Sequence, residues 1–235
     1  MDLDKTGIPG LDEILKGGLR RNSSILVKGS PGSGKTILAL QFIYAGAKKG
    51  EPGVFITAEE DLDDLRAHAK TLGMGLEDYE KKKLIFLVKQ PVTLKKLISI
   101  ATPLDLILKG KVKRVVMDSL TIFRYSTDDE MSYRKEILNL IENMKKVLFM
   151  ATAEEKKTGL NNLGATAEDY LFDGVIRLIK IRRENNFERC IFVEKARGQD
   201  HMIDIYPFTI TNKGLVVHPK EIPFSLMESE YKGRK

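Results

Sequence analysis

The chain of 235 residues has little of several residue types on which other protein classes depend. Cys190 is its only cysteine, which excludes a disulfide within the chain and fits a reducing compartment. Tryptophan is absent, and His68, His201 and His218 do not stand at the spacing of metal ligands. The sequence shows neither a signal-peptide pattern nor an apolar run as long as a membrane span. We therefore expect a soluble, cytoplasmic protein.

The composition indicates a globular chain, because 42% of the residues are hydrophobic and 31% are charged. The formal net charge of +6 is mild. It permits a polyanionic partner, but an excess of surface lysine explains it without one. The length suits one domain over residues 1–235, with a core at about 6–219 and a polar tail at 227–235.

One stretch fits the phosphate-binding pattern G-x-x-x-x-G-K-[ST], the Walker A motif or P-loop, at every fixed position. Its residues are Gly29, Ser30, Pro31, Gly32, Ser33, Gly34, Lys35 and Thr36. Residues 25–27 before it predict a strand, and residues 37–47 after it predict a helix. Glycines let the backbone wrap phosphates, and a helix N-terminus adds N–H donors. We expect this loop and Ile37 to bind a nucleoside triphosphate, with Lys35 reaching the β- and γ-phosphates.

Strand-like and helix-like runs alternate through the first two-thirds of the chain, and strand-like runs follow one another in the last third. The predicted strands are residues 25–27, 54–58, 84–88, 114–117, 147–151, 175–181, 189–195, 203–211 and 215–217. The predicted helices are residues 37–47, 61–72, 94–100, 104–108 and 133–146. The alternation predicts an α/β fold with a mainly parallel sheet covered by helices, and the last strands predict a β-meander that extends the same sheet.

Asp118 closes the apolar strand at residues 114–117. A P-loop needs an acid on a neighbouring strand to hold Mg²⁺, and Thr36 supplies a hydroxyl ligand in the loop itself. We therefore expect Thr36 and Asp118 to bind Mg²⁺, the alternative being that Asp118 caps a turn. Thr152 follows another strand and is either a hydroxyl near the γ-phosphate or a turn residue.

Glu59 and Glu60 follow the predicted strand at residues 54–58. If that strand lies next to the P-loop strand, its carboxyl end opens onto the phosphate site, because open α/β sheets bind ligands at that edge. One of the two carboxylates could then act as a base or position a water molecule. Alternatively, the pair favours the N-terminus of the next helix. Spacing alone leaves both interpretations open.

Lys195 and Arg197 stand two apart in a strand-like segment, so that both side chains point to one face. Paired cations can stabilise a γ-phosphate as its charge redistributes. Charged residues also decorate sheet edges and discourage aggregation, and from the residues alone we prefer this second interpretation.

Several segments over nearly the whole chain together resemble the KaiC-like branch of the RecA-superfamily ATPases. The N-terminal ones are residues 6–13 (TGIPGLDE) and 17–19 (GGL), followed by the P-loop. The later ones are residues 55–60 (FITAEE), 116–119 (VMDS), 195–202 (KARGQDHM) and 206–211 (YPFTIT). The last two segments are specific to this branch.

The resemblance implies a RecA-like core and a ring, commonly a hexamer, with ATP and Mg²⁺ at the subunit interfaces. Paired glutamates are catalytic in such proteins, which implies that Glu60, assisted by Glu59, orients the attacking water. It also implies that Lys195 and Arg197 reach the ATP of a neighbouring subunit, with His201 as a candidate nucleotide contact. The expected activity is Mg²⁺-dependent ATP hydrolysis.

The chain also departs from the tandem members of this family, because it carries one such domain where they carry two. Asp169 and Tyr170 stand where the autokinase members carry a Ser-Thr pair. We therefore do not expect autophosphorylation.

Two other classes of function stay open on the sequence. RecA-like strand-exchange proteins bind single-stranded DNA through loops beside the core, here residues 123–132 and 154–166. Arg124 and Tyr125 suit that role, whereas the acidic residues close behind them disfavour phosphate contact. The other class is a nucleotide-gated signalling module with negligible turnover, whose nucleotide state a partner reads. The sequence identifies no protein partner.

Overall fold

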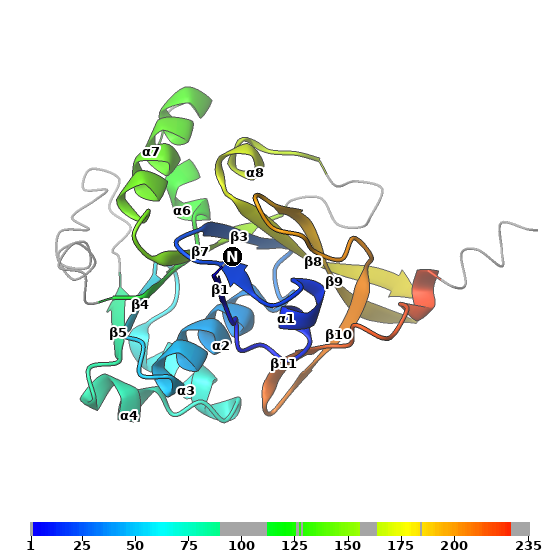
Figure 1. Cartoon of the computed structure of the whole chain (residues 1–235), viewed down its shortest axis with the longest axis horizontal. Helices are drawn as coiled ribbons and strands as arrows, with labels where there is room; N and C mark the ends of the chain where they lie inside the picture. Colours follow the sequence, from blue (N-terminus) through cyan, green and yellow to red (C-terminus); the bar gives the residue numbers. More distant parts are fainter. Residues whose placement is uncertain are drawn as a thin grey trace, which may run out of the picture.

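The computed structural model describes residues 2–89, 112–125, 127, 129–155, 164–183 and 185–226. These residues form a nine-stranded sheet whose strand order is β11-β10-β9-β8-β3-β7-β6-β4-β5 (Figure 1). Its strands are β3 (Ser24–Gly29), β4 (Gly53–Thr57), β5 (Ile85–Lys89), β6 (Arg114–Asp118), β7 (Leu148–Glu154), β8 (Gly174–Arg183), β9 (Asn186–Ala196), β10 (Tyr206–Thr211) and β11 (Gly214–Val217). A separate antiparallel pair consists of β1 (Leu3–Asp4) and β2 (Leu19–Arg20).

The helices of the described residues are α1 (Leu11–Ile14), α2 (Lys35–Lys48), α3 (Leu62–Thr71), α4 (Leu76–Lys81), α6 (Thr121–Arg124), α7 (Glu130–Asn143) and α8 (Ala167–Leu171). None of them is long and apolar enough to cross a membrane.

The sheet has a parallel part and an antiparallel part. Neighbouring strands from β8 through β3, β7, β6 and β4 to β5 run parallel. Next to β8, the strands β9, β10 and β11 continue the same sheet in antiparallel pairs. This arrangement confirms the predicted α/β class with a mainly parallel sheet and a C-terminal β-meander.

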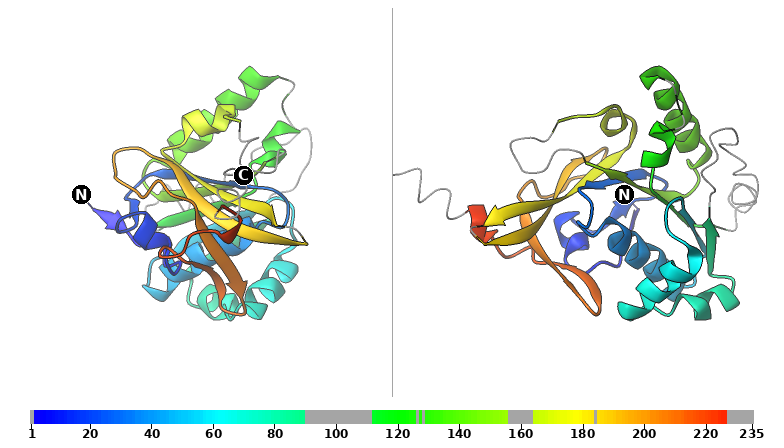
Figure 2. Two further views of the ribbon diagram at one scale, coloured as in Figure 1. Left: turned by 90° about the vertical axis from the view of Figure 1, so that its right-hand side faces the viewer. Right: turned by 180° about the vertical axis from the view of Figure 1, so that it is seen from behind.

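Helices cover both faces of the parallel strands, with α2, α3 and α4 on one face and α6 and α7 on the other (Figures 1 and 2). Side chains alternate between these faces along each strand. Val27 and Phe55 enter the core beneath α2, whereas Leu26 and Val54 enter the core beneath α7. Burial on both faces explains why the strands are continuous apolar runs.

The parallel strands bring their carboxyl ends to one edge of the sheet, and this edge carries the P-loop. The strand that ends in Asp118 was expected beside the P-loop strand and is not its neighbour, and the condition stated for Glu59 and Glu60, that their strand lies next to the P-loop strand, is not met. The order in this part of the sheet is β3-β7-β6-β4. One strand therefore separates the P-loop strand β3 from β6, which ends in Asp118, and two strands separate it from β4. Strands that are buried on both faces share the same apolar composition, so their order cannot be read from the sequence.

The element boundaries differ from the prediction at a few places. The helix α7 begins at Glu130, because the Asp129 side chain accepts a hydrogen bond from the backbone N–H of Ser132 (2.9 Å) and caps the helix. The strand β10 begins at Tyr206, and Ile203 before it is exposed. The short helices α1, α4, α6 and α8 were not predicted, since one or two turns carry little periodic signal.

Some predictions fall outside the described residues. These are the helices at residues 94–100 and 104–108, the tail at 227–235, and part of each candidate DNA-binding loop.

Arg114 fastens the N-terminal segment to α2 and β6. The residue is 1% exposed, and the guanidinium lies 4.8 Å from the centroid of the Phe42 ring. It forms an ion pair with Glu51 (2.8 Å) and donates to the carbonyl oxygens of Phe42 and Lys5, both at 3.0 Å. A Cβ on Gly46 would lie 2.6 Å from the guanidinium Nε, so only glycine leaves room for this side chain.

Replacing this guanidinium removes a buried charge that several acceptors share. We expect Arg114→Met to lower the free energy of unfolding by about 3 kcal/mol or more, because the Glu51 carboxylate and backbone carbonyls lose their donors. Denaturant unfolding measures the change. Arg134→Met, at an exposed site on α7, is the matched control and should change the free energy by no more than about 0.5 kcal/mol. An equally stable Arg114 variant would contradict this role.

Candidate nucleotide-binding site

Glycines allow the P-loop to turn directly from β3 into α2. Gly29 ends β3 against β8, where a Cβ would lie 2.6 Å from the carbonyl oxygen of Leu178. Gly32 and Gly34 have φ angles of +68° and +105°, in the left-handed region that glycine adopts without strain. Within the turn, the N–H of Ser33 donates to the carbonyl oxygen of Ser30 (3.1 Å). At Gly29, Gly32 and Gly34 the loop needs glycine, because a Cβ would meet β8 or strain the backbone.

The first turn of α2 supplies N–H donors next to this loop. The N–H of Leu38 donates to the carbonyl oxygen of Gly34 (3.0 Å). The preceding N–H groups, at Lys35, Thr36 and Ile37, have no partner within the helix, because the first turn never does. The helix extends over 14 residues and places a partial positive charge at this end. Such a donor set fits phosphate oxygens.

Lys35 folds back onto the loop. Its Nζ donates to the carbonyl oxygens of Gly29 (2.9 Å) and Ser30 (3.2 Å). Burial lowers the pKa of the Lys35 ammonium, whereas the negative charges of Glu154 and Asp118 act in the opposite direction. A buried ammonium with only carbonyl acceptors gains from an anion placed beside it, which suits a phosphate ligand.

Thr36 and Asp118 meet although their elements are not neighbours in the sheet. The Thr36 hydroxyl donates to the Asp118 carboxylate (2.7 Å), and the Thr152 hydroxyl donates to the other carboxylate oxygen. Burial raises the pKa of Asp118, while these two hydroxyl donors lower it. The predicted Mg²⁺ ligands are thus in contact, and Thr152 lies beside them.

The donor chemistry of this pair fits Mg²⁺, which prefers oxygen ligands and keeps several waters or phosphate oxygens. Across the residues that the structure describes, no group of three His, Cys, Asp or Glu side chains could hold a metal ion. An ion at Thr36 and Asp118 would therefore take most of its ligands from the nucleotide and from water.

Glu59 and Glu60 lie at the same edge, but each is held by different residues. The Glu59 carboxylate accepts a hydrogen bond from the Ser119 hydroxyl (2.7 Å). The backbone N–H of Glu60 donates to the Thr57 hydroxyl (3.1 Å), and His68 Nδ1 lies 3.7 Å from the Glu60 carboxylate. One glutamate is therefore fixed through its side chain and the other through its backbone.

The environment of Glu60 changes its acidity. Burial raises the pKa of Glu60, the neighbouring His68 lowers it, and the charge of Asp118 raises it further. A carboxylate whose pKa is raised is a stronger base than an exposed glutamate, which suits a group that accepts a proton from water.

Sequence reasoning missed the residues that position these glutamates, Thr57, Ser119 and His68. Thr57 ends β4 and Ser119 directly follows Asp118, so their places at strand ends were the available signal. His68 gave none, because its approach to Glu60 depends on the direction in which α3 leaves the sheet.

Lys195 and Arg197 face the same element, as their spacing predicts, and that element is α8. Lys195 Nζ donates to the carbonyl oxygen of Asp169, and the Arg197 guanidinium donates to that of Tyr170 (2.8 Å). Burial lowers the pKa of Lys195, and the charge of Arg197 lowers it further. Their hydrogen bonds therefore hold the end of a helix and do not connect them to the P-loop of their own chain.

His201 lies in the connection between β9 and β10 and is partly exposed. Its Nδ1 lies 2.9 Å from the carbonyl oxygen of Met202. The Met202 N–H donates to the carbonyl oxygen of Ile14 (2.8 Å), which attaches this connection to α1. The structure thus gives His201 a local contact and does not place it at the P-loop.

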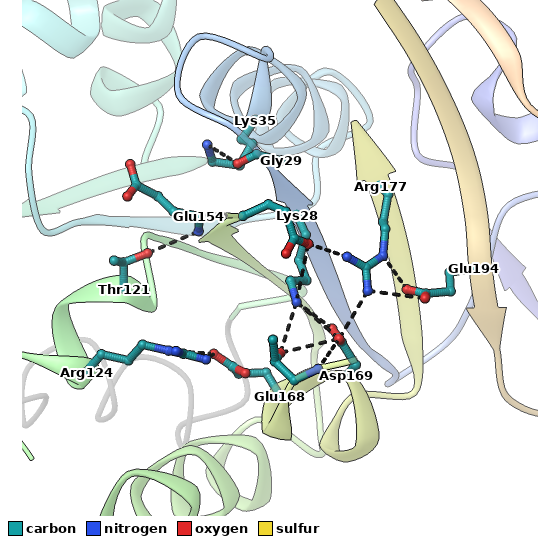
Figure 3. Close-up of polar contacts among 12 residues, drawn as sticks. Lys28, Gly29, Lys35, Thr121, Arg124, Glu154, Glu168, Asp169, Arg177 and Glu194 are labelled. Carbon is teal, nitrogen blue, oxygen red and sulfur yellow. Dashed lines mark hydrogen bonds and ion pairs between the residues drawn. The ribbon is translucent and has the colours of Figure 1, made fainter. Parts of the chain in front are cut away.

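A buried cluster of charges lies directly behind the P-loop, on the side of α8 (Figure 3). Lys28 and Arg177 are each 1% exposed and both contact the Asp169 carboxylate, at 3.0 Å and 3.1 Å. Arg177 also pairs with Glu194 (2.6 Å) and with Glu155. Because Lys28 directly precedes Gly29, this cluster fixes the end of β3 to α8, β8 and β9.

A shift in the register of β8 and β9 explains how Glu194 and Lys195 both reach this region. Val175 pairs with Lys195 and Ile176 pairs with Val193, so Glu194 is an extra residue on β9. Such a bulge redirects side chains that would otherwise alternate. Glu194 contacts the Arg177 guanidinium, while Lys195 contacts α8.

A cavity of about 830 Å³ lies between α6, α7 and α8, beside the described parts of the two candidate DNA-binding loops. Its lining includes the carboxylates of Asp129, Glu130, Glu154, Glu155 and Glu168 and the guanidinium groups of Arg124 and Arg134. Arg124 is already paired with Glu168 (2.7 Å). Carboxylates repel nucleic-acid phosphates, so this lining does not favour DNA.

Comparisons with known proteins identify the family of the chain. A family model described as the KaiC ATPase matches residues 4–222. A UPF0273 protein of Methanopyrus kandleri is 31% identical in an alignment that covers 92% of this chain and 92% of that protein. The circadian clock oscillator protein KaiC of Parathermosynechococcus lividus is 32% identical over 92% of this chain, which corresponds to 42% of the clock protein.

A solved structure resembles the whole fold. A KaiC-like protein of the hyperthermophilic archaeon Pyrococcus horikoshii OT3 gives a TM-score of 0.78 at 32% identity, covering 93% of this chain and 99% of that one. Fold and site therefore define an ATP-binding protein with a RecA-like core. The chain belongs to the KaiC ATPase family, which confirms the resemblance seen in the sequence.

The buried carboxylate of Asp118 should make the empty site less stable. Burial raises the pKa of Asp118 in the folded state above its value of about 3.9 in the unfolded chain. Below about pH 3.9 the carboxyl group is mostly protonated in both states and its charge costs no stability. Above the folded-state pKa it is ionised in both states, and the full cost of burying the charge lowers the stability. We expect Asp118→Asn to raise the melting temperature of the nucleotide-free protein by a few degrees at pH 7 and to leave it unchanged near pH 3. Thermal unfolding across this range measures the effect. Exposed Asp64→Asn should show no such gain, and a less stable Asp118 variant at pH 7 would oppose this account.

Proposed function

We propose that the protein hydrolyses ATP in a Mg²⁺-dependent reaction, as a ring whose active sites lie between subunits. One observation carries this proposal. The Thr36 hydroxyl donates to the Asp118 carboxylate (2.7 Å) beside the P-loop, and burial lowers the pKa of Lys35 while the charges of Glu154, Asp118 and Glu59 raise it. Phosphate-binding, metal-binding and acid–base groups thus share one edge of the sheet. We also propose that residues 1–235 form one domain.

In this proposal each residue at the edge has one task. The loop amides and Lys35 bind the phosphates, and Thr36 and Asp118 would hold Mg²⁺, which when bound neutralises charge on the phosphate oxygens. Glu60 orients the attacking water and accepts its proton, which its raised pKa supports. Glu59 assists from its position on the Ser119 hydroxyl.

Lys195 and Arg197 complete the site of the adjacent subunit in this proposal. Two observations support it: both cations are bound to α8 by backbone carbonyls, and neither hydrogen bond ties them to the loop of their own chain. A cation supplied by a neighbour stabilises the charge of the transferred phosphoryl group and is worth roughly 10³–10⁵ in rate where it has been measured. His201, three residues after Gly198, would approach the same nucleotide.

Removing the proposed base separates chemistry from binding. We expect Glu60→Gln to lower the turnover of ATP about 10²–10³-fold and to leave ATP affinity within a factor of about three, because the amide cannot accept the proton. Phosphate release and calorimetric titration measure the two quantities. Glu59→Gln keeps an oxygen for the Ser119 hydroxyl and should lose less. Unchanged turnover in the Glu60 variant would remove its role, and negligible turnover in the wild type would favour a signalling module.

Mixing two inactive variants tests whether the cations act between subunits. The first variant, Lys35→Met, lacks the loop ammonium, and the second, Lys195→Met with Arg197→Met, lacks the proposed cations. Each should be inactive alone. In rings mixed at equal amounts, an intact loop meets an intact neighbour at about a quarter of the interfaces, so about a quarter of wild-type activity should return. Mixed rings, verified by native mass spectrometry, that stay inactive would show that the cations act within one subunit.

A further inference from the structure

A second ammonium group contacts the P-loop from β8. Leu178 on β8 pairs with Gly29. Lys180 follows two residues later, so its side chain lies on the same face of β8 as that of Leu178. Lys180 Nζ donates to the carbonyl oxygen of Pro31 (3.0 Å). It would also lie 3.3 Å from a Cβ on Gly32. The side chain therefore reaches the middle of the loop from the strand beside it.

The two lysines at this loop are bound in the same manner. Lys35 Nζ contacts the carbonyl oxygens of Gly29 and Ser30, and Lys180 Nζ contacts that of the next residue, Pro31. An ammonium group has three donors, and a neutral carbonyl is a weaker acceptor than an ionised phosphate oxygen. Each lysine can thus exchange a loop carbonyl for a stronger acceptor.

The pairing of like charges also favours an anion at this position. Lys35 Nζ and Lys180 Nζ contact the carbonyl oxygens of consecutive loop residues, Ser30 and Pro31, so two positive charges face the same short loop and repel each other. In the described part of the chain, no ion pair joins either lysine to a carboxylate. An anion between them would relieve this repulsion and gain two charge-assisted hydrogen bonds.

We propose that Lys180 is a second phosphate-binding cation of the P-loop, acting on the nucleotide bound by its own subunit. On binding, its Nζ leaves the Pro31 carbonyl and contacts an oxygen of the terminal phosphates. This inference rests on the proposed function, because it adds a ligand to the same nucleotide site. The competing role for Lys180 is a clamp that only fixes the loop through Pro31.

The number of phosphates on the nucleotide distinguishes these two roles. A loop clamp supports every nucleotide that needs the loop, so its loss should weaken ATP, ADP and AMP by the same factor. A cation on the terminal phosphates should matter for ATP and ADP and not for AMP, whose single phosphate lies nearest the ribose. The charge itself is sufficient for the second role, so arginine should replace lysine.

The experiment measures the affinities of ATP, ADP and AMP, with Mg²⁺, by calorimetry or by displacement of bound ATP. We expect Lys180→Met to weaken ATP binding about tenfold and AMP binding less than about twofold. Lys180→Arg should stay within about threefold of the wild type, because a guanidinium also donates charge-assisted hydrogen bonds to phosphate oxygens. The matched control is Lys70→Met, at an exposed site near the end of α3, which removes the same charge and should leave all three affinities unchanged.

Three results would overturn the inference. Unchanged ATP affinity in Lys180→Met would show that the ammonium stays on the Pro31 carbonyl. An equal loss for ATP and AMP would assign Lys180 to the loop clamp. A loss that Lys180→Arg does not restore would also exclude a role based on charge. If the wild type itself binds no nucleotide, the proposed function fails, whereas normal wild-type binding with any of the three results overturns this inference alone.

Discussion

The hydrogen bond between the Thr36 hydroxyl and the Asp118 carboxylate is the contact on which the site depends (2.7 Å). It joins the first turn of α2 to the end of β6 across the intervening β7, whose Thr152 hydroxyl donates to the same carboxylate. This contact requires the parallel strands to end at one level, because a shift of one strand by two residues would move its last side chain by roughly 7 Å. The two hydrophobic cores, one on each face of the sheet, hold the strands at that level.

The burial of charged groups around this contact favours the binding of an anion together with a metal ion. Burial disfavours the charged forms of both Lys35 and Asp118, as the directions of their pKa changes show. Lys35 satisfies its ammonium with loop carbonyls, which are weaker partners than phosphate oxygens. A nucleotide with its metal ion would supply the missing charges to both groups. In the proposed function, the relief of these two buried charges would contribute to the affinity for the nucleotide.

The charge cluster behind the loop serves a different purpose. Lys28 and Arg177 are buried and both form ion pairs with the buried Asp169, so these charges are compensated without a ligand. The cluster fixes β3 to α8, and α8 also accepts the hydrogen bonds of Lys195 and Arg197. The loop of one subunit is therefore mechanically connected to the cations that we propose for its neighbour.

Much of the fold was readable from the sequence, because strand-like apolar runs and amphipathic helices carry their own period. The strand before the P-loop and the helix after it were equally readable, since β3 and α2 lie where the sequence predicts them. Strand order was not readable, as the separation of β3 and β4 by two strands shows. Contacts between distant segments, such as His68 with Glu60 and Lys180 with Pro31, depend on that order and carry no local signal.

One structure would test the central claim most directly, that a P-loop and a neighbouring subunit together enclose a nucleotide. It is the protein crystallised with Mg²⁺ and a non-hydrolysable ATP analogue. We expect the triphosphate on the amides of the loop and on Lys35, the metal ion at Thr36 and Asp118, and Lys195 or Arg197 of an adjacent copy beside the γ-phosphate. A loop without nucleotide, or a bound nucleotide that no cation of a second copy approaches, would contradict the account.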